Sequence, residues 1–568
     1  MSLAHLSLLG AAVGAVAGLA IAGLHGLIQA AQWSLVLAQE QWQGWGGSGL
    51  RIFLTTAYGG VLLGLVYSLF KPRHRHGGFV HIIERLTYHQ GQFPARNLWL
   101  QILGTVLATS SHQAVGREGA AAHMGAAAGS WIGQRLDVPT ASVRALVGCG
   151  AAAGISASFN TPLAGVIFIM EVIVVEYSVA KLAPSIVAAV CANAVAHLWL
   201  QSHPALIATN SGLLSMAELP YLALMGVLLG LLARLYLDLA AQATSRLRRW
   251  PIWVGMSLVG VITALGAVAV NDLVDNGFSV INRALAGELE LSVAASLGGL
   301  MLLCSALGIA AGLPGGVIMP CMLIGACVGL VFGEWGGILS QSPASDPGVY
   351  ALLGLGGMVA AVLQAPLTAL VLLVELSART GILLPAMLVV VTAVVVARGD
   401  TAGLSVFTLV LRNRGLDYRN DPVSQSLRRI SVMAAMNRSI ARAPVQMALD
   451  DARALLNRHP DWIVVQLESG TRFALAASDL LHACNAKDSQ GGEIKVGEDT
   501  PSRIDLSKIP GERKQLASIH LRASLQEAWD ALKEQTADAL CVEKNTHNNQ
   551  TTIYGVLTPE AIDRAYRT

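Results

Sequence analysis

Apolar segments broken by glycine fill the chain from Met1 to about Arg398, and this pattern constrains the fold more than any other feature. Only 13% of all residues are charged, about half the share usual in a soluble protein. From Asn413 onward the composition becomes that of a soluble domain. We therefore expect an all-α, multi-pass membrane body followed by a smaller water-facing tail. The longest apolar segments approach the roughly 20 residues that a helix needs to cross a bilayer, and they are 52–70, 219–239, 254–270 and 383–397.

Further apolar segments are shorter and contain glycine. They are 98–109, 119–132, 145–158, 297–312 and 317–332. A helix that ends at bilayer depth leaves amide groups unpaired, so that end must face protein, an ion or water. Broken helices of this kind indicate a permeation or substrate site near the middle of the membrane.

Two stretches of the membrane body match each other. Pro162 and Pro366 are each followed by leucine, and a glutamate stands nine residues after each proline, at Glu171 and Glu375. We interpret the two glutamates as a matched pair with a shared structural role in hydrogen bonding.

A glycine-rich loop precedes each matched stretch, at 116–119 and at 313–316. Small residues recur in any membrane bundle because they allow close packing. The paired motifs favour a duplication instead, with two inverted repeats of broken helices whose site lies at their interface. The approximate ranges of these repeats are 1–212 and 213–412.

Glu118 lies in the first loop, in the sequence Gly116-Arg117-Glu118-Gly119. An ionised carboxylate at bilayer depth is costly, but unpaired amides and the helix dipole at a helix start stabilise carboxylates and free anions alike. We therefore expect Glu118 and an anion to compete for one group of amides, which makes Glu118 a gate. The alternative is that Glu118 only caps its own helix or pairs with Arg117.

The second loop repeats this pattern without a carboxylate. Free amides at Val317 and Ile318 could bind an anion from the other half of the fold, and the apolar side chains suit a large, weakly hydrated ion such as chloride. We expect Arg117 to form a structural ion pair, because a full positive charge in the path would trap the anion.

Four motifs together resemble the CLC family of chloride channels and chloride/proton exchangers. They are GREG at 116–119, GAAAGISASFNTPLAG at 150–165, GGVIMP at 315–320 and LSVFTLVLRNRGLDY at 404–418. The resemblance implies the CLC fold and a homodimer with an anion path in each subunit. It assigns the gate to Glu118, and it assigns anion ligands in the two loops to Gly116, Arg117, Gly119, Val317 and Ile318.

Three positions depart from the family pattern. Gly77 stands where the family has a serine beside the central ion, and Phe407 stands where it has a tyrosine. Val172 replaces the inner glutamate that relays protons in exchangers. These losses favour a passive chloride channel. A chloride/proton antiporter remains the alternative, with Glu171, Glu176 or a water chain as the relay, and a fluoride-selective transporter is a third, less favoured reading.

The tail is predicted to contain two α/β units after a linker at 413–429. The units, about 430–485 and 506–568, resemble a tandem pair of CBS domains. Expected helices lie at 448–456 and 524–532, and expected strands at 462–467, 472–476, 539–543 and 552–557.

Nucleotide binding by this pair is weakly supported. CBS pairs often bind adenine nucleotides through a threonine and an aspartate three residues later. Asp479 has Ala476 in the threonine place, and Thr558 has Ala561 in the aspartate place. A structural or dimerising role is at least as well supported, and we expect no cofactor.

The remaining sequence features concern the cellular location of the protein and the functional classes that the sequence excludes. Basic clusters between apolar segments and after the last one place those loops and the tail on the cytoplasmic side of the inner (plasma) membrane. These clusters include Lys71, Arg73, Arg246 and Arg412. The spacing of the histidines does not match a zinc site. The sequence contains no basic patch of the kind that binds nucleic acid. It also contains no hydrolase or intramembrane-protease motif, so we do not expect an enzyme.

Overall fold

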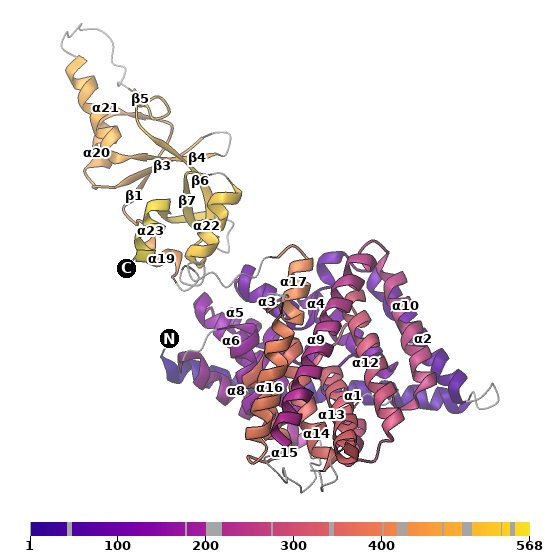
Figure 1. Cartoon of the computed structure of the whole chain (residues 1–568). Coiled ribbons are helices and arrows are strands. Elements are labelled where there is room, and N and C mark those ends of the chain that lie inside the picture. Colours follow the sequence, from indigo (N-terminus) through magenta and orange to yellow (C-terminus); the bar gives the residue numbers. More distant parts are fainter. Residues whose placement is uncertain are drawn as a thin grey trace. The chain divides into compact units, whose positions relative to one another are not determined.

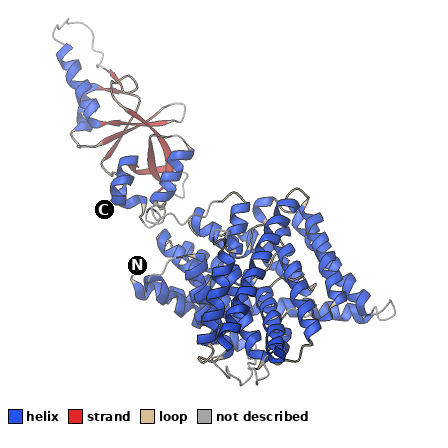
Figure 2. Cartoon of the chain, viewed as in Figure 1, coloured by secondary structure: helices blue, strands red, loops and turns tan. Residues whose placement is uncertain are grey.

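The structure is a computed structural model, and the chain divides into two compact units, Met1–Tyr418 and Arg419–Thr568. Among the residues that the structure describes, helices make up the first unit and every strand lies in the second (Figure 1, Figure 2). The described residues are 2–41, 48–175, 179–199, 218–273, 277–339, 346–399, 403–416, 427, 430–467, 471–490, 503–535, 537–545 and 551–567.

The first half of the membrane body runs through helices of unequal length. They are α1 (Leu3–Gln41), α2 (Ser48–Ser68), η1 (Pro72–His74), α3 (Gly78–Tyr88), α4 (Ala95–Ser110), α5 (Glu118–Arg135), α6 (Thr140–Phe159), α7 (Pro162–Phe168), the π-helical turn η2 (Ile169–Ile173) and α8 (Val179–Trp199).

The second half follows the same plan. Its elements are α9 (Leu219–Leu247), α10 (Ile252–Ala269), η4 (Asn271–Leu273), α11 (Phe278–Leu285), α12 (Leu291–Ala311), α13 (Ile318–Leu339), α14 (Pro347–Leu363), α15 (Pro366–Ser377), α16 (Leu383–Arg398) and α17 (Val406–Asn413). The expected boundary between repeats near 212, and most of the expected linker at 413–429, lie outside the described residues.

Eight of the described helices are long and apolar enough to cross a membrane. They include α6, α12 and α13, whose lengths are 20, 21 and 22 residues. These helices extend beyond the apolar segments 145–158, 297–312 and 317–332, because helix length follows backbone hydrogen bonding and not hydropathy. Alanine is an excellent helix former at any depth, so the helices continue beyond their most apolar part.

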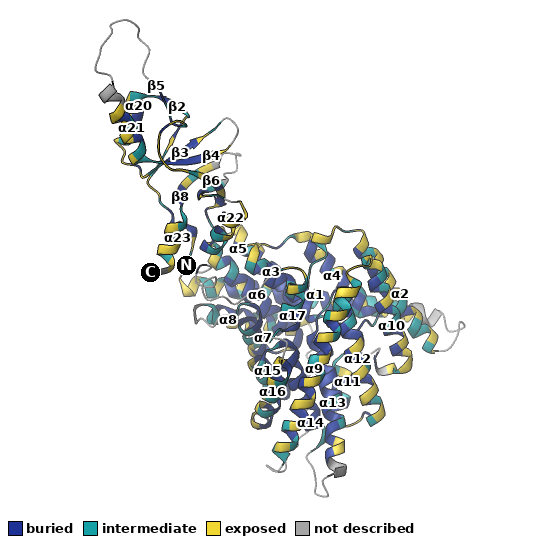
Figure 3. Ribbon diagram, turned by 45° about the horizontal axis from the view of Figure 1, so that its top comes forward, coloured by how far each residue is buried: buried dark blue, intermediate teal, exposed yellow. Residues whose placement is uncertain are grey.

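Glycine pairs hold the matching helices of each half together. Gly125 of α5 contacts the carbonyl of Gly150 in α6, and Gly325 of α13 contacts the carbonyl of Gly354 in α14; a Cβ at any of these glycines would collide with the partner backbone. Such close approach is possible only without a side chain. Almost all of α14 is buried, and α9, α13, α15 and α16 pack against it (Figure 3).

The tail unit contains a mixed six-stranded sheet with the order β1-β3-β4-β6-β7-β8 and a separate β2-β5 pair. The strands are β1 (Ile440–Ala443), β2 (Gln446–Ala448), β3 (Trp462–Gln466), β4 (Arg472–Ala476), β5 (Arg503–Asp505), β6 (Arg513–His520), β7 (Ala539–Asn545) and β8 (Thr551–Leu557). The helices are α19 (Val432–Ala435), α20 (Leu449–Leu456), α21 (Ala477–Gln490), α22 (Leu525–Glu534) and α23 (Pro559–Arg567). The helices and strands expected in this region are confirmed to within two residues at each end.

The two halves of the tail share one strand pattern. In the first, β1 pairs parallel with β3, and β3 pairs antiparallel with β4 before α21. In the second, β6 pairs parallel with β7, and β7 pairs antiparallel with β8 before α23. Each half has an apolar cluster of its own, which makes the tail a repeated α/β unit.

Candidate functional site

The two glycine-rich loops meet in space. The Gly116 amide donates to the Gly316 carbonyl at 2.9 Å, and the Gly316 amide donates to the Gly116 carbonyl at 2.6 Å. This short antiparallel bridge joins the start of α5 to the start of α13. The helix starts that were predicted to form one site are therefore adjacent.

Glu118 spans this junction. Its side chain is fully buried, and Oε1 accepts hydrogen bonds from the amides of Ile318 at 2.6 Å and Met319 at 3.2 Å. These amides belong to the first turn of α13, where helical partners are missing and the helix dipole favours negative charge. The carboxylate thus occupies an anion-binding helix terminus. Pairing with Arg117 or capping of its own helix, the alternative roles for Glu118, would not explain these hydrogen bonds to the other half of the fold.

The donors to Glu118 include one amide named from the sequence and one that was not. Ile318 was expected to offer its amide to an anion, and Met319 was not named. The Val317 carbonyl accepts from the Cys321 amide at 3.1 Å and so begins the helical bonding of α13, whereas anion binding by the Val317 amide stays a prediction. Counting the first helical turn from its first residue would have identified Met319, because amides at that position are unpaired.

Glycine is required around the carboxylate for space. A Cβ at Gly116 or Gly316 would collide with the Glu118 carboxyl group, and a Cβ at Gly119 would collide with the Gly315 carbonyl. Among the described residues, Oε2 of Glu118 has no hydrogen-bond partner. The carboxylate is therefore closely enclosed and yet keeps capacity to accept a further bond or a proton.

Phenyl rings surround the position where the central ion was expected. The ring of Phe79 lies 5.1 Å from that of Phe407 and 5.0 Å from that of Phe168, measured between centroids. All three rings are buried. Gly77 forms the N-cap of α3 with an extended backbone, at φ −153°. Neither Gly77 nor Phe407 can offer a hydroxyl, so this region is more apolar than the family pattern would make it.

Glu171 and Glu375 cap each other's half of the fold. The Glu171 carboxylate accepts from the Leu367 amide at 3.1 Å, and from the amide and hydroxyl of Thr368 at 2.7 and 2.6 Å. The Glu375 carboxylate accepts from the amides of Leu163 and Ala164 at 2.8 and 2.7 Å. Each glutamate thus caps the first turn of the other's helix, α15 or α7. The hypothesis of a shared hydrogen-bonding role is confirmed.

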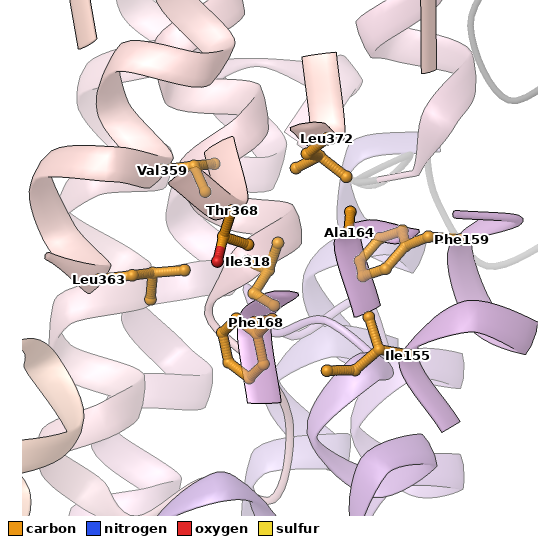
Figure 4. A pocket seen from close by; sticks show the side chains of 9 residues that line it. All are labelled: Ile155, Phe159, Ala164, Phe168, Ile318, Val359, Leu363, Thr368 and Leu372. Atoms are coloured by element: carbon orange, nitrogen blue, oxygen red, sulfur yellow. The ribbon is translucent and has the colours of Figure 1, made fainter. Parts of the chain in front are cut away.

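A small apolar pocket lies between the two halves (Figure 4). Its walls are formed by counterparts from α6 and α7 on one side and from α14 and α15 on the other, with Ile318 between them. Ile318 donates its amide to Glu118, and Thr368 donates its hydroxyl to Glu171. The pocket therefore lies between residues that contact the two carboxylates. The lining residues are Ile155, Phe159, Ala164, Phe168, Ile318, Val359, Leu363, Thr368 and Leu372.

The nucleotide-binding candidates of the tail have partners within the tail. The Thr558 hydroxyl accepts from the Ala561 amide at 3.4 Å, and its bond to the Glu560 carboxylate holds the pKa of that carboxyl below its usual value. The Asp479 carboxylate lies so close to Gly511 that a Cβ there would collide with it. Over the ranges that the structure describes, no group of three potential metal ligands comes together.

Comparison with known proteins shows which protein family the membrane body matches. The profile of the voltage-gated chloride channel family matches residues 59–398. A putative chloride channel protein, ClcB-like, of Ralstonia nicotianae is 32% identical over 390 residues, which cover 66% of this chain and 88% of that protein. The voltage-gated ClC-type chloride channel ClcB of Escherichia coli K12 is 29% identical over 410 residues, covering 69% and 96%. The chain belongs to the voltage-gated chloride channel (CLC) family.

Solved CLC structures share the fold. A slow cyanobacterial Cl−/H+ antiporter aligns with a TM-score of 0.64 at 22% identity, covering 73% of this chain and 99% of that one. A eukaryotic CLC transporter aligns with a TM-score of 0.63 at 17% identity and covers 98% and 97%, so the likeness extends into the tail. CLC proteins are channels and transporters, not enzymes, and they use no cofactor.

Proposed function

We propose that this CLC protein conducts chloride and similar small anions through a path in each subunit, and that Glu118 is the gate. The observation that supports this proposal is the Glu118 carboxylate bound to the amides of Ile318 and Met319. A halide carries the same charge and needs the same donors. Carboxylate and anion therefore compete for one helix terminus, and only one can occupy it.

The gate opens when the carboxylate leaves α13. Protonation of Glu118 removes the charge that the helix terminus stabilises, so the side chain is released and an anion can replace it. The enclosing Gly116 and Gly316 leave the backbone accessible to an ion of similar size. Acidic conditions should therefore increase the time that the path is open.

We propose a passive channel as the transport mode. Val172 carries no proton where exchangers have a glutamate, and Phe407 and Gly77 offer no hydroxyl to the central ion. An ion held weakly at the centre leaves quickly, which favours conduction over tightly coupled exchange.

Glu118→Gln tests the gate. Glutamine keeps the size of the side chain without its charge, so it mimics the protonated gate. We expect anion flux into liposomes to rise several-fold at neutral pH and to lose its pH dependence. Glu334→Gln, at an exposed position of α13, the helix whose first amides bind Glu118, is the matched control and should leave both unchanged. Unaltered flux and pH response in Glu118→Gln would show that this residue is not the gate.

A chloride/proton antiporter is the second candidate. The pocket between Ile318 and Thr368 supports it, because it lies between partners of Glu118 and Glu171. Glu171 also lies in the π-helical turn η2, whereas its counterpart Glu375 lies in regular α-helix. Such π turns are frequent at functional sites. Glu171 could then pass protons to Glu118 in place of the lost residue at Val172.

A matched pair of variants separates the two modes. In liposomes with a chloride gradient, an antiporter drives protons uphill and a channel does not. If the wild type drives protons, Glu171→Gln should abolish proton movement, and Glu375→Gln, which changes the equivalent cap, should preserve it. We expect no uphill proton movement in the wild type. Observing it would replace the channel with the antiporter.

The assembly and the tail complete the proposal. We propose a homodimer in the inner (plasma) membrane with the tail in the cytoplasm and folded as a CBS pair, which the repeated β-α-β-β-α order supports. Adenine nucleotide binding by Asp479 and Thr558 stays a prediction. Comparison of fluoride with chloride currents tests the fluoride-selective alternative.

A further inference from the structure

A stripe of polar residues runs along one face of α4. Asn97, Gln101 and Thr105 follow one another at intervals of four residues, so they lie above one another on the helix. Their exposed fractions are only 1%, 3% and 0%. Buried polar side chains in a membrane body are costly unless they bond to something. This stripe therefore requires an explanation.

The ends of the stripe hold two loops of the proposed anion path. Asn97 Nδ2 donates to the carbonyls of Arg73 and His76, each at 3.1 Å, and so fixes the chain just before Gly77. At the other end, the Thr105 hydroxyl donates to the Pro314 carbonyl at 3.3 Å, in the loop that leads to α13.

Gln101 lies between these two anchors. Its Nε2 donates to the Thr105 hydroxyl oxygen at 3.1 Å. Its carboxamide oxygen lies so close to Gly77 that a Cβ at this position would collide with it. The backbone of Gly77 is extended, which any residue can adopt. Glycine is therefore needed here for space, because the head group of Gln101 fills the volume that a side chain at residue 77 would take.

We propose that Gln101 is the side chain that supplies the polar contact at the central anion position and so sets anion affinity and selectivity. The inference rests on the anion path proposed above. In the structure Thr105 uses one of the two N–H groups on Nε2, and the carboxamide oxygen is the atom beside Gly77. A turn of the head group would bring Nε2, with two N–H donors, to the side of Gly77. A carboxamide N–H can donate to an anion as a hydroxyl does, and rotation of the head group exchanges its donor and acceptor ends.

The simpler view is that Gln101 only ties the loops together. A purely structural role predicts that variants change folding yield or maximal flux without changing which anion is preferred. A ligand role predicts a change in the chloride concentration that gives half-maximal flux. Substitutions of similar size at residue 101 separate the two, because they change polarity and charge while they keep the volume.

Gln101→Leu and Gln101→Glu are the test variants, measured by flux in liposomes against chloride concentration and by the ratio of chloride to bromide flux. One lost hydrogen bond to a charged group is worth about tenfold or more in affinity. We expect Gln101→Leu to raise the half-saturating chloride concentration about tenfold. Gln101→Glu should raise it further, because its carboxylate repels the anion, and both should alter the flux ratio. Unchanged half-saturation and ratio in both variants would overturn the proposal.

An exchange of side chains gives an independent test. Gly77→Ser alone should reduce yield or flux, because the new Cβ meets the Gln101 head group. Gly77→Ser combined with Gln101→Ala removes that clash and supplies a hydroxyl in the same space, so half-saturation should return close to the wild-type value. Wild-type half-saturation in Gln101→Ala alone would overturn the proposal.

The experiments distinguish failure of the proposed anion path from failure of the proposed role of Gln101. If the wild type moves no anion and Glu118→Gln has no effect, the proposed function fails and Gln101 has no anion to bind. If both behave as expected and only the residue-101 variants leave affinity and selectivity unchanged, the inference alone fails.

Discussion

At the scale of single residues, the site depends on which atoms can approach the Glu118 carboxylate. Two amides bind it, and two glycines leave the room that it occupies. Both glycines were visible in the sequence as parts of loops, but their purpose was not, since a glycine can serve a turn, a close approach or flexibility. The structure shows that close approach is the reason at Gly116 and Gly316.

Gly316→Ala should displace the gate. The added methyl group would occupy space that the Glu118 carboxyl group fills, so the carboxylate should leave the α13 amides more often. We expect higher anion flux at neutral pH and a weaker pH dependence in liposomes. Gly299→Ala in α12 adds a methyl where no neighbouring atom lies within 4 Å, and it should change neither. Wild-type flux in both variants would contradict the steric argument.

At the scale of elements, the carboxylates that cap helix starts matter both for the proposed gate and for the junction between the two halves of the fold. α13 is capped by Glu118, α15 by Glu171 and α7 by Glu375, and each cap comes from the other half of the fold. A buried helix start with unpaired amides is costly, so a carboxylate there stabilises the junction between halves. In the tail, α22 uses a local cap, because its start is close to a suitable serine in sequence.

The cap of α22 gives a prediction about local stability. The Ser524 side chain accepts from the Glu527 amide at 3.3 Å, and the Glu527 side chain accepts from the Ser524 amide at 2.8 Å. Loss of such a cap costs about 1 kcal/mol. Ser524→Ala should therefore speed amide hydrogen exchange in α22 of the full chain roughly fivefold. Ser518→Ala, on an exposed face of β6, should not, and equal exchange in both variants would refute the role of the cap.

At the scale of the whole molecule, the membrane body and the tail are separate compact units with separate apolar cores. The proposed anion path uses only residues of the first unit, namely the two loops, α3, α4 and α17. Units with their own cores can in principle fold alone. We therefore expect the path to form without the tail.

Removal of residues 419–568 should leave anion transport in place. We expect a shortened chain that ends at Tyr418 to be produced in the membrane and to retain most of the wild-type flux in liposomes. A full-chain protein prepared in parallel is the reference. Normal yield together with abolished flux would show that the tail takes part in conduction.

The sequence alone determined the membrane body, the repeated motifs and the two helix starts, and it pointed to Glu118 as the candidate gate. These are local properties, because hydropathy, glycine and proline act within a few residues, and unpaired amides follow from any helix start. Only the tertiary structure decided which acceptor fills each group of amides. Glu118 reaches Met319 in the other half, and Gln101 fills the space beside Gly77. Such partners depend on how distant helices pack, and one-dimensional spacing does not contain that information.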